Sequence, residues 1–213
     1  MVKSILIMLT ALSLAACQSD SPDPQPPADP ETSTVVDTAL IHAAAAELVD
    51  RFQKNLNSEL MAAISTRQAS GAIEVCRDIA PAVADSHSTG AWTIRRVSEK
   101  YRNPDNRATR EELAILTGFA DTAITEPQFL LQMGRNTDSL PIWRYYQPIY
   151  TQQLCLNCHG GIQTLAPGVY QAVKKAYPED KAVGYDSDQL RGMFVVETVW
   201  PDGEEFARQL AGE

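Results

Sequence analysis

The segment 35–64 carries apolar residues at helical spacing. An apolar side chain falls at every fourth position, and further apolar residues widen the stripe: Leu40, Ala44, Leu48, Phe52, Leu56 and Leu60, with Ile41, Ala45 and Val49 beside them. This pattern predicts a long amphipathic helix that buries one face. Asp37 and Thr38 lie where an N-cap is expected, and Ser70-Gly71 interrupts the pattern at the other end.

The next segment predicts a shorter helix over 72–85. Its apolar face contains Cys76, and Pro81 is placed to kink or divide it, because proline lacks the N–H that an interior helical position donates. The sequence Thr-Arg-Glu-Glu fits a capping box that opens a third helix over 109–123. A fourth helix is expected over 168–176.

Runs of β-branched and aromatic residues, bounded by turn residues, predict four strands. These runs occupy 92–97, 128–133, 142–149 and 192–200. There is no internal repeat and no regular alternation of strands with helices. The pattern therefore predicts an α+β fold in which helices pack on an antiparallel sheet.

The strongest chemical motif is Cys155-Leu156-Asn157-Cys158-His159. Cys-x-x-Cys-His is typical of c-type haem attachment. Two thiols with two residues between them can both reach the vinyl groups of one porphyrin edge, and the following imidazole can bind iron on the proximal face. Gly160-Gly161 then let the backbone bend away close to the macrocycle. The motif predicts one covalently bound haem c.

Three simpler interpretations of the two cysteines are less well supported. A redox dithiol usually opens a helix within a βαβ pattern, and none precedes this motif. A structural zinc site needs four ligands at finger-like spacing, and no second Cys-x-x-Cys or matching histidine pair is present. A disulfide framework does not fit a chain with four cysteines in which one ends the leader, two form the haem motif and Cys76 is left over.

The first residues resemble a bacterial lipoprotein leader. Lys3 precedes a short apolar run, which ends in Leu14-Ala15-Ala16-Cys17. This ending resembles a lipobox, in which the cysteine becomes the lipidated first residue. We therefore expect a signal peptide at 1–16, a lipidated Cys17 with a proline-rich tether over 17–34, and a haem-binding domain over 35–213.

The expected cellular compartment and the net charge of the chain limit the kinds of partner that the protein can bind. Haem c is attached outside the cytoplasm, so the leader and the motif both favour a periplasmic, membrane-anchored lipoprotein, and Gln18 after Cys17 favours the outer membrane. The chain of 213 residues has a net charge of −9 and a pI near 4.8. This acidic net charge excludes a basic surface that would bind nucleic acid. Membrane attachment would therefore depend on the acyl chains rather than on basic residues.

The second axial ligand of the iron decides the function, and the residues alone leave it open. The candidates are Cys76, His42, His87, Met61, Met133 and Met193. Histidine and methionine are common partners of haem c. Cys76 could instead be a buried thiol that only packs in the core, and each of the two histidines could be a solvated surface residue.

Several motifs together resemble a known family. They are Ile73 to Pro81, Trp92 with Arg95-Arg96-Val97-Ser98, Tyr101 to Asn106, the haem motif with Gly160, and Tyr177-Pro178. In this order they are similar to the mono-haem c-type family with a PAS-like fold, formerly a domain of unknown function, which includes a cyanobacterial haem protein associated with photosystem II. The resemblance covers roughly Val35 to Trp200.

The resemblance implies how the haem is held. It implies a PAS-like five-stranded antiparallel sheet with a long N-terminal helix, and an iron held between His159 and Cys76. A thiolate ligand stabilises ferric iron, so a low reduction potential follows. Arg95, Arg96 and Arg77 are candidates to stabilise the thiolate or to pair with the haem propionates, and each could equally be a solvated basic residue.

Three functions fit a single haem c to different degrees. In a redox or small-ligand sensor, the Cys76–iron bond is released on reduction or displaced by CO or NO, and a signalling partner in the periplasm reads the change. The alternative is an electron carrier between membrane and soluble redox partners, which requires two firmly held axial ligands. A haem enzyme needs an open iron site with distal acid–base residues. Only His42 and His87 could supply a distal histidine, and neither lies in a recognisable site, so this function ranks last. We expect no catalytic residues.

Overall fold

The computed structural model of the chain describes residues 36–121 and 128–212. The compact unit begins at Asp37. The expected signal peptide 1–16 and the tether 17–34, with Cys17, lie outside the described residues. Within the described ranges, no helix combines the length and the apolar character that a bilayer span requires.

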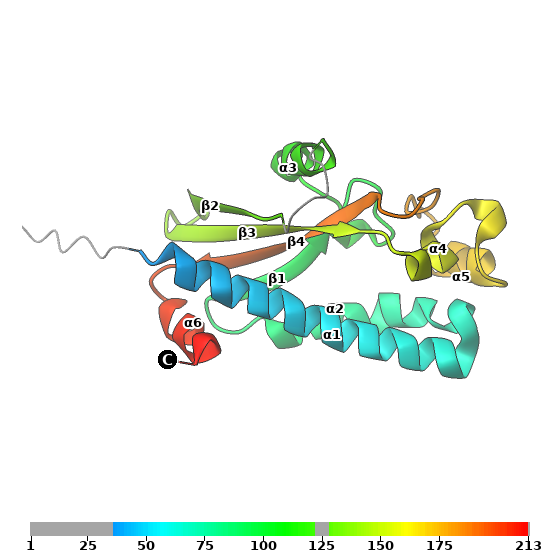
Figure 1. Ribbon diagram of the computed structural model, residues 1–213, viewed down its shortest axis with the longest axis horizontal. Coiled ribbons are helices and arrows are strands. Elements are labelled where there is room, and N and C mark those ends of the chain that lie inside the picture. Colours follow the sequence, from blue (N-terminus) through cyan, green and yellow to red (C-terminus); the bar gives the residue numbers. More distant parts are fainter. Residues whose placement is uncertain (1–35, 122–127, 213) are drawn as a thin grey trace, which may run out of the picture. The chain divides into compact units, whose positions relative to one another are not determined.

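Four antiparallel strands form one sheet in this unit (Figure 1). They are β1 (Trp92–Val97), β2 (Leu130–Arg135), β3 (Pro141–Tyr150) and β4 (Leu190–Val199), in the order β1-β4-β3-β2. All four predicted strands are confirmed, with shifts of a few residues at their ends. The described residues form four strands, whereas the resemblance implied five.

Helix α1 (Thr38–Gly71) lies along one face of the sheet (Figure 1). The predicted N-cap is confirmed, because the Asp37 carboxylate accepts hydrogen bonds from the N–H groups of Ala39 and Leu40 at 2.9 and 3.0 Å. The predicted apolar stripe is buried as far as Phe52, whose ring meets Phe194 of β4 with centroids 5.6 Å apart. Near the end of the helix, Gln68 has the non-helical φ of 60° and ψ of 178°.

Helix α3 (Arg110–Ala120) covers the opposite face of the sheet. Its capping box is confirmed: the Thr109 hydroxyl accepts from the Glu112 N–H at 3.2 Å, and the Glu112 carboxylate accepts from the Thr109 N–H at 2.8 Å. Beneath it lies a core cluster that includes Val97, Leu116, Phe119 and Met193. Because side chains alternate along a strand, Trp92, Ile94 and Arg96 of β1 face the other side, towards α1.

The predicted helix over 72–85 is present but divided. A π-helical turn (Val75–Ile79) precedes α2 (Ala80–His87). Pro81 lies in the first turn of α2, where its missing N–H does no harm, so the division occurs where the proline predicted it. Cys76 lies within the π turn. Such turns are uncommon in helices and are frequent at functional sites.

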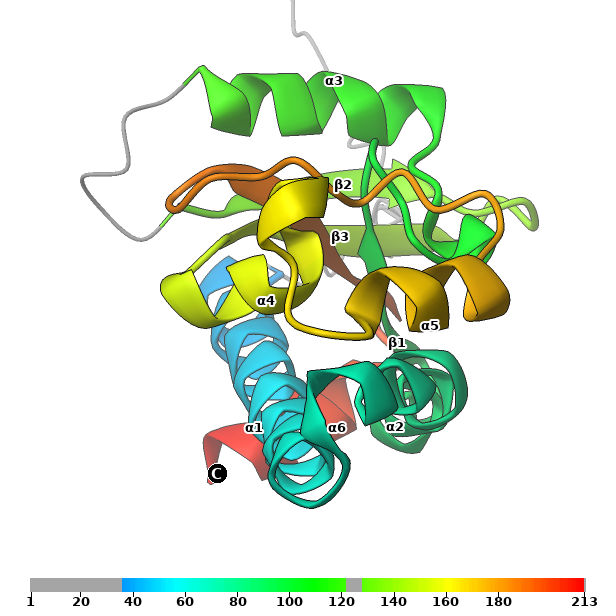
Figure 2. The ribbon, with the colours of Figure 1, turned by 90° about the vertical axis from the view of Figure 1, so that its right-hand side faces the viewer.

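One end of the sheet carries the segment that contains the haem motif (Figure 2). This segment contains α4 (Leu156–His159), the predicted α5 (Val169–Ala176) and the 3-10 turns Gln153–Cys155 and Ile162–Thr164. A further 3-10 turn (Pro104–Asn106) follows β1. Helix α5 packs on α1. The terminal helix α6 (Glu204–Ala211), which is not among the predicted helices, also packs on α1.

Candidate haem site

The two cysteines of the motif lie on one helical turn. Cys155 caps α4, and Cys158 lies three residues later within it, so both side chains point to the same side. Both thiols are half-buried and neither is in a disulfide; the Cys155 sulfur accepts a hydrogen bond from the Gln152 N–H at 3.4 Å. Gly160 is required directly after the motif, because a Cβ there would lie 2.6 Å from the Leu156 carbonyl oxygen. This is the local geometry that attachment of one porphyrin edge to two thiols requires.

The imidazole of His159 is held in one orientation. Its Nδ1 lies 2.7 Å from the carbonyl oxygen of Ala182, and its ring meets the Tyr185 ring edge-on with centroids 6.4 Å apart. With the proton on Nδ1 donated to a carbonyl, Nε2 is the nitrogen that can bind a metal. Burial, with the charges of Arg191 and Arg102, holds the pKa of His159 well below its usual value, so the ring is neutral, as a metal ligand must be.

Arg102 ties the haem motif to the rest of the domain. Its Nε donates to the Asp180 carboxylate at 3.0 Å, and its Nη2 donates to the Cys158 carbonyl at 2.6 Å and to the Ala182 carbonyl at 3.3 Å. The side chains of Arg102 and Asp180 are 6% and 2% exposed. One buried guanidinium therefore fixes both the cysteine that would carry haem and the carbonyl that orients His159.

Asp180→Asn should lower the free energy of unfolding by about 3 kcal/mol, because Arg102 would keep a buried charge without its counter-charge. Denaturant unfolding monitored by circular dichroism measures this. The matched control is Glu47→Gln, which removes the exposed helical pair with Arg51 and should cost only about 0.3–0.5 kcal/mol. Equally small losses in both variants would contradict the anchoring role of Arg102.

Cys76 lies in the same electrostatic cluster as the haem motif. Burial raises the pKa of the Cys158 thiol to about 11; Arg102 opposes the shift, and Cys76 and Cys155 add to it. The partly buried Arg96 also interacts electrostatically with Cys76, and its guanidinium lies 5.5 Å from the centre of the Phe52 ring. Ile73, one helical turn before Cys76, belongs to a core cluster against which Cys158 packs. The structure thus brings the segment of Cys76 to the haem motif, although roughly eighty residues separate them in the sequence.

The other candidates for the second axial ligand lie elsewhere. His42 stacks on Phe129 with ring centroids 4.1 Å apart, and both ring nitrogens of His87 have partners, the Val83 carbonyl at 2.8 Å and the Asn55 amide at 3.3 Å. Met193 is fully buried under α3, and Met61 and Met133 are exposed on α1 and β2. Neither histidine is the simple solvated residue that the sequence suggests.

The three arginine candidates have different surroundings, and the alternation of side chains along β1 separates Arg95 from Arg96. Arg96 is on the face of β1 that carries the cluster. Arg95 points to the opposite face, where it pairs with the buried Glu112 at the start of α3. Arg77 is exposed and makes a two-pronged ion pair with its neighbour Asp78, at 2.7 and 2.8 Å. Of the three, Arg96 alone has no such carboxylate partner among the described residues.

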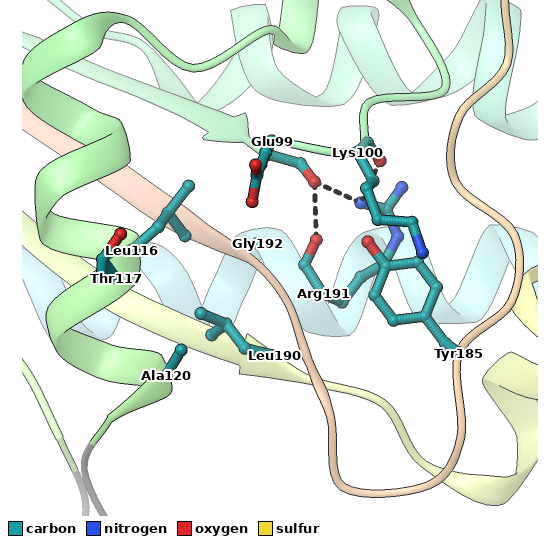
Figure 3. A pocket seen from close by; sticks show the side chains of 10 residues that line it. Glu99, Lys100, Leu116, Thr117, Ala120, Tyr185, Leu190, Arg191 and Gly192 are labelled. Carbon is teal, nitrogen blue, oxygen red and sulfur yellow. Dashed lines mark hydrogen bonds between the residues drawn. The ribbon is translucent and has the colours of Figure 1, made fainter.

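Sequence reasoning assigned no role to Arg102, Tyr177 or Tyr185, although the first two belong to the motifs that carry the family resemblance. Tyr185 is buried, and the cations Lys100 and Arg191 lie over its ring, with Nζ at 4.3 Å and Cζ at 5.5 Å from its centre. Lys100, Tyr185 and Arg191 also line a pocket of about 200 Å³ under α3 (Figure 3). This pocket lies on the α3 side of the sheet, and it adjoins the cluster through Tyr185, whose ring meets that of His159.

Two observations test whether these residues fit a haem. Three buried donor atoms lack a hydrogen-bond partner among the described residues: Arg102 Nη1, Tyr177 Oη and Arg191 Nε. Such donors suit anionic acceptors, which a thiolate and two propionates supply. Within the described residues, no three histidine, cysteine or acidic side chains gather as an ion site would need. A porphyrin brings its own four nitrogens and needs axial ligands only, so the residues fit haem.

Comparisons with known proteins agree with this geometry. The model of the Tll0287-like family matches residues 29–198. The crystal structure of the cyanobacterial haem protein Tll0287 superposes with a TM-score of 0.54 at 21% sequence identity, over 78% of this chain and 99% of that one. At this identity the likeness shows a shared fold. No curated protein matches the chain.

Proposed function

The chain belongs to the Tll0287-like family, and we propose that it is a c-type cytochrome with one covalently bound haem. Cys155 and Cys158 would carry the haem, and His159 and Cys76 would be its axial ligands. The observation that carries the proposal is the placement of Cys76 in the cluster formed by the attachment motif, with His159 already oriented by the Ala182 carbonyl. A related protein of the same fold is a haem protein.

When bound, the haem supplies a centre that gains and loses one electron. The protein contributes the environment of that centre. Cys155 and Cys158 would hold the group in place, the Ala182 carbonyl would strengthen His159 as a donor, and the positive charge of Arg96 would interact with the Cys76 sulfur. A thiolate ligand favours the ferric state, so we expect a low reduction potential and no catalytic role.

We assign the cytochrome a redox or small-ligand sensing role. A thiolate binds ferrous iron less firmly than ferric iron, so reduction would weaken the Cys76 bond. Cys76 lies in a π turn between Gly71 and Pro81, a local irregularity that can relax when the side chain is released. A signalling or redox partner in the periplasm would read that change.

Carbon monoxide distinguishes the sensor from an electron carrier. The reduced protein should bind CO, because CO can replace a weakened Cys76 ligand, and the Soret band should shift accordingly. Rapid-mixing absorption spectroscopy measures this. A ferrous spectrum that CO leaves unchanged, together with fast electron exchange with a small cytochrome, would favour the electron carrier instead.

We also propose that the protein is a lipoprotein in the periplasm, anchored through Cys17 and sorted to the outer membrane. The support is the lipobox, the proline-rich tether and the need to attach haem c after export. Cys17→Ser should move the haem protein from the membrane fraction to the soluble periplasmic fraction, with its haem spectrum unchanged. Retention of the variant in membranes would contradict acylation at Cys17.

A further inference from the structure

The hydroxyl of Tyr177 is a buried polar group next to the haem motif, without a hydrogen-bond partner among the described residues. The residue directly follows α5 and is 6% exposed. Its ring packs with Ile73, Val169 and Val173, and Cys158 lies against the same cluster. The hydroxyl itself is buried and has no hydrogen-bond partner among the described residues. Because a buried hydroxyl without an acceptor is destabilising, an acceptor is expected in the haem-loaded protein.

Among its charged and titratable neighbours, Cys76 is the acceptor that best suits the buried Tyr177 hydroxyl. These neighbours are Cys76, Arg102, Arg77 and Asp78. The two arginines are donors and cannot accept. The Asp78 side chain is 56% exposed and is held by Arg77 at 2.7 and 2.8 Å, whereas the Tyr177 hydroxyl is buried. Ile73, which packs in one core cluster with Tyr177, lies one helical turn before Cys76, so the sulfur of Cys76 remains, and as a thiolate it is a good acceptor.

We propose that the Tyr177 hydroxyl donates a hydrogen bond to the Cys76 sulfur when that sulfur is the axial ligand, and thereby sets the strength of the bond. The inference rests on the proposed function. Tyr177 would be a positioning residue, because it acts on the iron through Cys76. It would approach the sulfur from α5, on the side of the haem motif, whereas Arg96 approaches from β1.

This hydrogen bond has a predictable electronic effect. A proton donor draws negative charge from the sulfur, so the thiolate donates less to the iron. The ferric state, which depends most on that donation, loses stability relative to the ferrous state. The hydroxyl should therefore raise the reduction potential and weaken the iron–sulfur bond, and its removal should do the reverse.

The test is Tyr177→Phe in the haem-loaded protein, which keeps the ring and removes the hydroxyl. At a fixed electrode potential the ferrous-to-ferric ratio should fall about tenfold, which is about 59 mV for a one-electron couple. The iron–sulfur stretch in the resonance Raman spectrum should move to higher frequency. The matched control is Tyr170→Phe, the same change on the exposed side of α5, which should alter neither quantity.

A second variant covers the case in which Tyr177→Phe does not fold. Site-specific 3-fluorotyrosine at position 177 is a stronger donor with the same packing, so it should shift both quantities in the opposite direction. A phenylalanine variant with the wild-type stretch would overturn the inference, even if its potential changes, because the acceptor would then be another group such as a propionate. A 3-fluorotyrosine variant with the wild-type reduction potential and the wild-type iron–sulfur stretch would also overturn the inference.

The outcomes also separate this inference from the proposed function. Absence of an iron–sulfur stretch in the wild-type protein would refute Cys76 ligation, and the role of Tyr177 would fall with it. A wild-type stretch that Tyr177→Phe leaves unchanged would refute the role of Tyr177 alone.

Discussion

Cys158→Ala should yield a protein in which at most one thioether joins the haem, and Cys155→Ala should behave alike. The double variant should retain no haem after denaturation in acid acetone, because no thioether remains to hold it. The intact mass of the denatured chain measures this directly: wild type should carry the mass of one haem, and the double variant none. This is the largest effect expected of any substitution in the chain.

Cys76→Ala is the control for that experiment. Its thiol is half-buried in the same cluster, but the proposal makes it an axial ligand and gives it no part in attachment. The variant should therefore carry one covalent haem, as wild type does. Covalent haem on the double variant, or its loss from Cys76→Ala, would contradict the assignment of roles among the three thiols.

Cys76→Ala should raise the reduction potential strongly. Removing the thiolate takes away the donor that stabilises ferric iron, so we expect an upward shift on the order of 0.1–0.3 V, within the roughly 0.8 V over which axial ligands set haem potentials. A spectroelectrochemical titration measures it. Cys76→Met should also raise the potential, because a neutral thioether sulfur stabilises ferric iron less.

His42→Ala is a useful comparison for the same titration. His42 was a candidate from residue chemistry, but it stacks on Phe129 at the beginning of α1. The His42→Ala variant should therefore have the reduction potential of wild type. A shift in this variant that matched that of Cys76→Ala would mean that the axial ligand had been misassigned.

Local patterns predict much of this fold. The N-cap at Asp37, the capping box at Thr109 and the strand 92–97 each depend on residues close together in the sequence, and each is present. Helix α6 is different. Its only buried residue is Ala207, and it is positioned by its packing on α1 and by the Trp92 indole, which donates to the Gly203 carbonyl at 2.8 Å. Phe206, Ala207 and Leu210 fall at helical spacing, but the segment is short and is not among the predicted helices.

The attachment motif is local and needs no structure to be recognised, whereas its surroundings depend on the fold. Residue chemistry could not choose Cys76 from six candidates, because the choice depends on how the segment before α2 returns to α5 and the haem motif. The sequence alone does not distinguish Arg95 from Arg96 as haem-site candidates, but side chains alternate along β1, so the two point to opposite faces of the sheet. Arg102 is an ordinary arginine in sequence, and only its contacts with Cys158 and Asp180 show its role.

Ligation of one haem iron by His159 and Cys76 is tested most directly by low-temperature electron paramagnetic resonance of the ferric protein, recorded for wild type and for Cys76→Ala. A low-spin signal typical of thiolate ligation should appear in wild type and vanish in the variant. A signal typical of two histidines, or of histidine with methionine, that persists unchanged in the variant would contradict the account and leave Cys76 as a packing residue.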